Sequence, residues 1–224
     1  MPALAGEAMI ATSHPLATRA GLRALERGGH AVDAALAAAA VLTVAEPTDN
    51  GLGGDAFALV WDAGRLYGLN GSGRSPAVLT GEGVAEEGPR SVTVPGAVRL
   101  WADLADRFGR FGLDEALTHA AGLAEAGIAC TARIADKWSR ADRAPWPAPR
   151  LGGRYALPDL ARTLGRIASG GPDAFYTGTV AAAISEATWL AEADLTAEYF
   201  EKFGDAVPAE LHAELEALRA RLTA

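Results

Sequence analysis

One arginine, Arg74, has the surroundings of a group that could bind a substrate. It follows Gly73 and precedes Ser75-Pro76, directly after a predicted hairpin. Small neighbours leave its guanidinium room to reach a cleft, and the planar fork of N–H donors suits bidentate capture of a carboxylate. An arginine at a strand end is more often a solvated surface charge. Taken alone, Arg74 is therefore better interpreted as a surface charge.

Other residue types that support catalysis are not arranged for it. The four histidines are scattered, with no HExxH motif and no Cys/His cluster: His14, His30, His119 and His212. We interpret them as capping, core-edge or surface residues, so the sequence predicts no metal site and no cofactor. Cys130 follows a predicted helix end without an obvious base nearby, which predicts a quiet, partly buried thiol. The run Gly71-Ser-Gly-Arg-Ser75 has the wrong register for a nucleophile elbow.

A glycine-rich run, Asn50-Gly-Leu-Gly-Gly-Asp55, could be mistaken for a phosphate-binding loop. It lacks the Lys-Ser/Thr pair of such a loop, and it leads into a strand rather than a helix N-terminus. We therefore interpret it as a turn.

Two helices and a hairpin must position these residues. Ser13-His14 before Pro15 begins a first helix, and Gly28-Gly29 ends it. A second helix, from about Ala31 to Ala45, is apolar on nearly all sides, so we expect it to be buried centrally. The hairpin has predicted strands at Ala56–Trp61 and Leu66–Leu69 around a turn at Asp62-Ala63-Gly64.

The rest of the chain is predicted to be mostly helical, which gives an α+β order of elements. The expected elements are a strand at Ser91–Val94, helices at Val98–Arg107, Leu113–Ala126 and Ala132–Arg140, a loop at Ala144–Gly153, and helices at Asp159–Ala168, at Val180–Trp189 and from about Pro208.

Composition narrows the classes of partner. A chain of 224 residues with 50% hydrophobic content can bury a full core. Its net charge of −8 and the lack of a basic stripe argue against a nucleic-acid partner.

The most apolar stretch, Ala34 to Ala45, is too short to cross a membrane, and the first residues do not resemble a signal peptide. One cysteine excludes an internal disulfide. We expect a cytoplasmic protein without a membrane partner.

Seven segments together resemble the γ-glutamyltranspeptidase family, in family order and at near-family spacing across about residues 8–195. They are Ala11-Thr-Ser-His-Pro-Leu-Ala17, Gly28-Gly-His-Ala-Val-Asp-Ala-Ala35, Glu46-Pro47, Gly51-Leu-Gly-Gly54, Ser72-Gly-Arg-Ser-Pro-Ala77, Val94-Pro-Gly96 and Gly170-Gly-Pro-Asp-Ala-Phe-Tyr-Thr-Gly178. The resemblance implies an N-terminal nucleophile hydrolase, an αββα sandwich of which this chain carries only the helix-rich large-subunit part.

The resemblance also implies a chemistry. Members of this family cleave themselves into two subunits, and the threonine freed at the small subunit's N-terminus attacks a γ-glutamyl amide, such as that of glutathione. Arg74 matches the family arginine that grips the substrate's α-carboxylate. The glycines at 51, 53 and 54 are better interpreted as backbone packing near the pocket than as catalytic groups.

Beyond Leu195 the family pattern is lost, so we divide the chain into a family-like domain at 1–195 and a divergent helical tail at 196–224. No segment matches the cleavage site or the small subunit, and no threonine is a credible nucleophile. The tail carries a leucine seam: Leu211, Leu215, Leu218 and Leu222. That seam could dock on its own domain or pair two chains as a homodimer.

Two functions remain open. In the first, the chain is an enzyme component that needs a separately supplied small subunit for γ-glutamyl transfer or hydrolysis. In the second, it is a truncated, non-catalytic homologue that binds a ligand or a partner. A threonine-led small-subunit sequence in a neighbouring reading frame would distinguish them.

Overall fold

A computed structural model of the chain describes residues 5–75, 91–140, 147–186, 197, 201 and 209–223. The chain forms two compact units. The first contains Met1–Ser72 and Pro95–Phe175, and the second contains Gly73–Val94 and Tyr176–Ala224. The first unit therefore holds nearly all of the described helices and every described strand.

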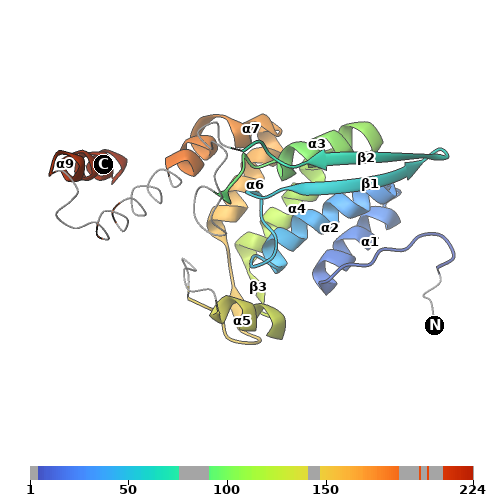
Figure 1. Cartoon of the computed structure of the whole chain (residues 1–224). Coiled ribbons are helices and arrows are strands. Elements are labelled where there is room, and N and C mark those ends of the chain that lie inside the picture. Colours follow the sequence, from blue (N-terminus) through green and yellow to red (C-terminus); the bar gives the residue numbers. More distant parts are fainter. Residues whose placement is uncertain are drawn as a thin grey trace. The chain divides into compact units, whose positions relative to one another are not determined.

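The first unit is a helical layer with two small antiparallel sheets, so its class is α+β as predicted (Figure 1). Its helices are α1 (Pro15–Glu26), α2 (Ala31–Ala45), α3 (Ala97–Phe108), α4 (Leu113–Ala126), α5 (Ala132–Ser139), α6 (Pro158–Gly170) and, at its end, α7 (Asp173–Tyr176). Its strands are β1 (Ala56–Asp62), β2 (Arg65–Gly71), β3 (Ile128–Ala129) and β4 (Arg154–Tyr155).

Helix α2 is the centre of this unit, which confirms the prediction from its all-round apolar sequence. It packs against α1, α3 and α4, and α4 in turn packs against α6. Along α2, Val41 and Ala40 are fully buried and Leu36 is almost so. The small alanines let neighbouring helices approach closely, while the leucine and valine side chains fill the space between them.

Both ends of α1 follow the predicted signals. His14 is the N-cap of α1, and its Nδ1 accepts a hydrogen bond from the Leu16 N–H at 3.2 Å. At the other end, Gly28 has a φ of 87°, the left-handed conformation expected just past a helix.

A buried aspartate, Asp33, joins the start of α2 to the turn before α4. Its carboxylate accepts hydrogen bonds from the backbone N–H groups of His30 at 2.6 Å, Arg110 at 2.9 Å and Phe111 at 2.8 Å. Buried charge is stable only when it is well hydrogen-bonded, and three backbone donors meet that need. Asp33 is therefore a structural clamp.

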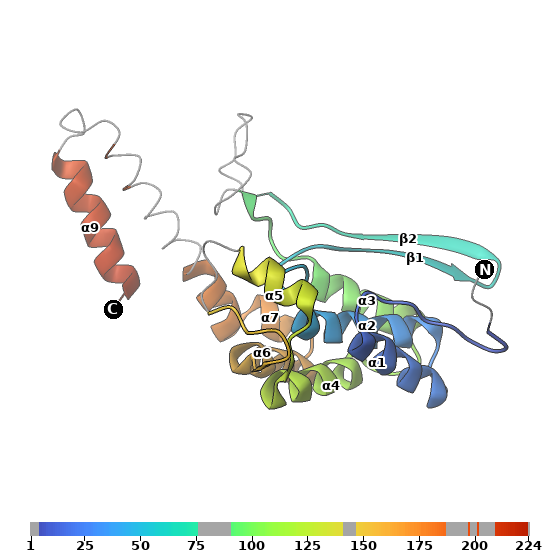
Figure 2. The same ribbon diagram turned by 90° about the horizontal axis from the view of Figure 1, so that it is seen from below.

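Strands β1 and β2 form a hairpin along one side of the helical layer (Figures 1 and 2). They pair in the register Asp62↔Arg65, so the loop is the two residues Ala63 and Gly64. Both have positive φ, 47° and 80°, as a type I′ turn requires. Tyr67 packs on Phe108 of α3 with ring centroids 5.1 Å apart, which fixes the inner face of the hairpin.

The outer face of the hairpin is apolar and exposed. Its large side chains alternate along β1, as the two-residue period of a strand requires. Phe57 is 70% exposed, Leu59 78% and Trp61 71%. Leu66, which pairs with Trp61 across the hairpin, is also exposed. No described residue of the first unit covers these side chains.

One local prediction is wrong, and two short elements were not predicted. Residues 91–94 are not a strand, although the Val94 N–H bonds to the Arg74 carbonyl at 3.0 Å; Pro95, which has no N–H, follows immediately. The pair β3–β4 was not predicted, because two-residue strands carry no period. The short helix α7 lies inside a stretch that was interpreted only as a motif.

The second unit contains a helix over residues 178–186 and helix α9 (Ala209–Thr223). The predicted helix at Val180–Trp189 is therefore confirmed up to residue 186, and its end lies outside the described residues. In the leucine seam, Leu215 is buried and Leu211 is exposed. Pairing of two chains through the seam stays a prediction. Among the described helices, none combines the length and apolarity needed to cross a membrane.

Candidate functional site

Arg74 lies three residues after β2 and is exposed. Its backbone carbonyl accepts the hydrogen bond from Val94 N–H, whereas its guanidinium forms no hydrogen bond or ion pair with another described residue. A guanidinium without an internal partner keeps all five N–H donors for a ligand. The position is thus compatible with the predicted carboxylate contact, which stays a prediction.

Gly73 explains how the backbone beside Arg74 is held. A Cβ at this position would lie 1.5 Å from the carbonyl oxygen of Val94, so no other residue fits without moving that segment. Immediately before it, the side-chain oxygen of Asn70 accepts hydrogen bonds from the backbone N–H of Ser72 at 2.9 Å and from its hydroxyl at 2.7 Å. The backbone on both sides of Gly73 is therefore fixed locally.

In the first unit, the glycine-rich loop lies between α2 and β1. The Gly54 carbonyl accepts hydrogen bonds from Gly96 N–H at 3.1 Å and Ala97 N–H at 3.0 Å, which ties the loop to the start of α3. A Cβ on Gly51, Gly53 or Gly54 would meet no described heavy atom closer than 3.9 Å. Close packing within the described residues is therefore not what requires glycine there, contrary to our interpretation. The loop is open.

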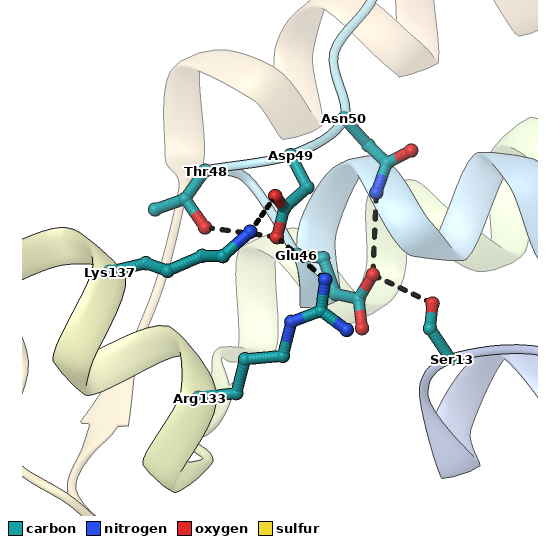
Figure 3. Close-up of polar contacts among 7 residues, drawn as sticks. All are labelled: Ser13, Glu46, Thr48, Asp49, Asn50, Arg133 and Lys137. Atoms are coloured by element: carbon teal, nitrogen blue, oxygen red, sulfur yellow. Dashed lines mark hydrogen bonds and ion pairs between the residues drawn. The ribbon is translucent and has the colours of Figure 1, made fainter.

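A polar network anchors the chain just before that loop (Figure 3). Glu46, the buried C-cap of α2, accepts hydrogen bonds from the Ser13 hydroxyl at 2.7 Å and the Asn50 side-chain amide at 3.4 Å. Its backbone carbonyl accepts from the N–H groups of Asp49 and Asn50, both at 2.9 Å. One residue thus holds both the turn after α2 and the segment before α1.

Asp49 extends this network to helix α5. Lys137 donates to its carboxylate, and Arg133 forms an ion pair with it at 3.6 Å (Figure 3). The hydrogen bond from Lys137, together with the two positive charges, holds the pKa of Asp49 below its ordinary value. Asp49 is therefore ionised at neutral pH and is not placed to serve as a proton donor. Its ion pairs connect the loop to α5.

Burial favours the neutral form of three titratable side chains: His14, Tyr155 and Cys130. Burial lowers the pKa of His14, although the nearby Glu46 charge opposes this shift. Burial raises the pKa of Tyr155, whose hydroxyl donates to the carbonyls of Val44 at 2.9 Å and Ala45 at 3.2 Å. Burial also raises the pKa of Cys130, which confirms the prediction of a quiet thiol.

Sequence reasoning missed Glu46, Asp49 and Tyr155 as parts of one framework. Glu46 was seen only inside the pair Glu46-Pro47, where a carboxylate at the negative end of a helix could have been noted as unusual. The partners of Tyr155 are more than a hundred residues away, so no local signal points to them. In the part of the chain that the structure describes, no group of three His, Cys, Asp or Glu side chains could hold a metal ion.

Comparison with known proteins decides the family. The γ-glutamyltranspeptidase family model matches residues 17–220. The chain belongs to the γ-glutamyltranspeptidase family. The match includes Arg74, the glycine-rich loop and all of helix α2, and it continues past residue 195, where we had placed the end of the family-like domain. That boundary stays a prediction.

Individual relatives agree with this assignment. An acylase ACY 1 proenzyme from Pseudomonas sp. (strain SE83) is 35% identical over 216 residues, covering 83% of this chain and 39% of the relative. A glutathione hydrolase-like YwrD proenzyme from Bacillus subtilis (strain 168) is 35% identical over 201 residues, covering 77% and 37% respectively. The crystal structure of Helicobacter pylori γ-glutamyltranspeptidase matches with a TM-score of 0.76 at 28% identity, covering 82% of this chain and 60% of that chain.

These comparisons also show how much of each relative the chain spans. It spans about two fifths of the length of the two curated relatives. The comparisons therefore establish the family.

Proposed function

We propose that this family member is the substrate-binding part of an enzyme that transfers or hydrolyses γ-glutamyl groups, with glutathione-like amides as substrates. Family membership supports the reaction class. The observation that carries the proposal for this chain is Arg74: an exposed guanidinium without a described partner, on a backbone that Gly73 fixes. Its planar fork matches the α-carboxylate of a γ-glutamyl group.

The bond-breaking step is assigned to a polypeptide outside this chain. In the proposed reaction, a threonine hydroxyl attacks the γ-amide carbonyl and its proton passes to the threonine's own α-amino group. The C–N bond breaks, the amine leaves with a proton, and the acyl group stays on the threonine oxygen. Water or an amino acid then takes the acyl group. Arg74 contributes by orienting the glutamyl group before attack.

The β1–β2 hairpin supports the need for that second polypeptide. Phe57, Leu59 and Trp61 form an exposed apolar face on a two-stranded sheet, and such a hairpin is marginal by itself in water. Exposed apolar patches of this kind mark interaction surfaces. We propose that a sheet of the missing segment packs here, so that the two parts together form the αββα sandwich.

The relatives' names raise a question about substrate, because they include both an acylase and a glutathione hydrolase-like protein. Three chromogenic anilides separate the possibilities. The γ-glutamyl anilide carries an α-carboxylate and an α-amino group, the glutaryl anilide keeps only the carboxylate, and the valeryl anilide has neither. A γ-glutamyl enzyme prefers the first, whereas an acylase that reads only the carboxylate uses the first two equally.

The first experiment tests the missing nucleophile. The purified 224-residue chain is incubated with the γ-glutamyl anilide, alone and after co-expression with a threonine-led polypeptide from its neighbouring reading frame. We expect chromophore release only from the co-expressed pair. Robust turnover by the chain alone, abolished by a substitution within residues 1–224, would contradict the assignment of the nucleophile to another polypeptide.

The second experiment tests Arg74 in the active pair. Arg74→Lys should raise the KM for the γ-glutamyl anilide about tenfold or more with a smaller change in kcat, because a point charge cannot replace a bidentate fork. The valeryl anilide, which has no carboxylate, should be unaffected. Arg150→Lys, in an exposed loop of the first unit, is the matched control. Unchanged kinetics with the γ-glutamyl anilide would remove Arg74 from the site.

A further inference from the structure

A cavity of about 430 Å³ lies between helices α1, α2 and α4, in a part of the chain that the proposed reaction does not use. Its floor is apolar and built from small or aliphatic side chains: Ala20, Ala24, Leu36, Ala37 and Ala116. The ring of Phe111 lines one side. Concave sites of this size, with an apolar floor and a few polar groups, are typical of small-molecule binding.

Most charged groups at the rim already have partners. Arg27 forms a bidentate ion pair with Glu115 at 2.5 and 3.2 Å, and its guanidinium stacks over Phe111 at 5.5 Å from the ring centre. Asp33 is saturated by backbone N–H groups. These groups therefore have little capacity left for a ligand.

Two basic rim groups remain available: Arg23 on α1 and His119 on α4. Arg23 is exposed, and its guanidinium has no hydrogen-bond or ion-pair partner among the described residues. The half-buried His119 ring likewise has no described hydrogen-bond partner. Both line the cavity, so their N–H groups are placed to serve one bound group.

Two positive charges on α1 act on His119 at this rim. Burial lowers the pKa of His119, and the positive charges of Arg23 and Arg19 lower it further. The remaining charged rim group is Glu26, which lies on α1 with both arginines. A histidine beside two cations stays neutral until a negative charge arrives, and an anion between Arg23 and His119 would reverse that effect.

We propose that this cavity binds a small organic carboxylate, with its apolar body on the alanine floor and its carboxylate between Arg23 and His119. The floor offers no hydrogen-bonding side chain, so a fully polar ion such as phosphate would leave most of the cavity unused. The inference does not depend on γ-glutamyl chemistry or on a second polypeptide, because every residue it uses lies in the first unit.

Binding is tested on the purified full chain with benzoate as the probe. The histidine resonances are followed by NMR, and His119 is assigned from the signal lost in His119→Gln. Benzoate should shift the His119 signal saturably and raise the pKa of His119, because a bound carboxylate stabilises the protonated ring. Benzamide, which has the same ring without the charge, should bind at least about tenfold more weakly.

Variants separate the two parts of the site. Arg23→Ala should weaken benzoate binding about tenfold, since it removes the charge-assisted hydrogen bonds. Arg150→Ala removes an arginine that does not line the cavity and should leave binding unchanged. Ala37→Leu keeps both polar groups but fills the floor, so it should also weaken binding; its thermal unfolding is measured beside wild type to show that it folds.

Four outcomes would overturn the proposal: benzamide binding as tightly as benzoate, Arg23→Ala binding as tightly as wild type, inorganic phosphate competing as well as benzoate, or a pKa of His119 that does not move when benzoate saturates. Equally tight binding of benzamide would show that the cavity is purely apolar. Equal competition by inorganic phosphate would show that Arg23 is a surface cation that attracts any anion.

Discussion

Helix α2 and the β1–β2 hairpin are both apolar, but the first unit covers only one of them. Around α2 the neighbouring helices leave Leu36 only 4% exposed. On the outer face of the hairpin, Leu59 and Trp61 are mostly exposed, although the inner face packs on α3. Two segments with similar side chains thus have opposite environments within one unit.

The buried side chains of α2 stabilise the first unit, whereas the exposed side chains of the hairpin are available to a partner. Burying a leucine contributes roughly 1.5–3 kcal/mol, so α2 supplies stability that the outer hairpin face does not. Large apolar side chains that stay in water make no such contribution. Exposed apolar patches of this kind are typical of surfaces that a binding partner covers. On this argument the helical layer is packed by residues of the first unit, whereas the hairpin face has the exposure expected of the interface that we propose.

The largest effect is expected at the N-terminal end of α2. Asp33→Ala removes the acceptor of three backbone N–H groups, at His30, Arg110 and Phe111, and should lower the free energy of unfolding by about 4 kcal/mol in urea titrations. Asp33→Asn keeps one oxygen acceptor and should lose less. A loss below about 1 kcal/mol for Asp33→Ala would mean that the clamp is not needed.

A matched pair of leucines tests the comparison directly. Leu36→Ala in α2 removes a buried side chain and should reduce the free energy of unfolding by about 3 kcal/mol. Leu59→Ala on the hairpin removes the same atoms from water and should change it by less than about 0.5 kcal/mol. Equal losses at the two sites would show that the hairpin face is covered within the chain.

The hairpin face should matter once a partner is present. Trp61→Ala should weaken association with the threonine-led polypeptide about tenfold, since large aromatic side chains dominate the binding energy of interfaces. Met9→Ala, another exposed apolar residue but not on the hairpin, is the control. Biolayer interferometry on the two purified parts measures both. Equal affinities for Trp61→Ala and wild type would place the interface elsewhere.

The elements of this comparison were predictable from sequence because their signals are local. Helix α2 has the predicted bounds Ala31–Ala45, since His30 and Pro47 flank a run that is apolar except for Asp33 and Thr43. The hairpin was recognisable from its short turn at Gly64. In each case the residues that decide the structure are adjacent to the element, so one sequence was sufficient.

The contacts that hold these elements together were not predictable. Asp33 meets Arg110 and Phe111 almost eighty residues later, and Tyr155 reaches back to the end of α2. Tertiary hydrogen bonds of this kind leave no periodicity in the sequence. The exposure of Phe57, Leu59 and Trp61 was likewise hidden, because an alternating strand reads the same whether its apolar face is covered or open.

The smallest effect concerns pH and the cap that starts α1. Burial lowers the pKa of His14 below its ordinary value of 6.5, so the unfolded chain binds a proton that the folded chain resists. Stability from this group is therefore complete above pH 6.5 and declines as the pH falls from 6.5 towards the lower folded pKa. Protonation of Nδ1 also removes the acceptor for Leu16 N–H.

His14→Asn keeps an N-cap acceptor but does not titrate. The difference in free energy of unfolding between wild type and His14→Asn should therefore shift against wild type as urea titrations move from pH 7.5 to pH 5.5. Because the Glu46 charge opposes the shift, Glu46→Gln should make the wild-type histidine still harder to protonate and steepen this pH dependence. His119 titrates in the same range, but it is present in every variant and cancels from the difference. Parallel pH profiles for wild type and His14→Asn would show that His14 does not couple folding to pH.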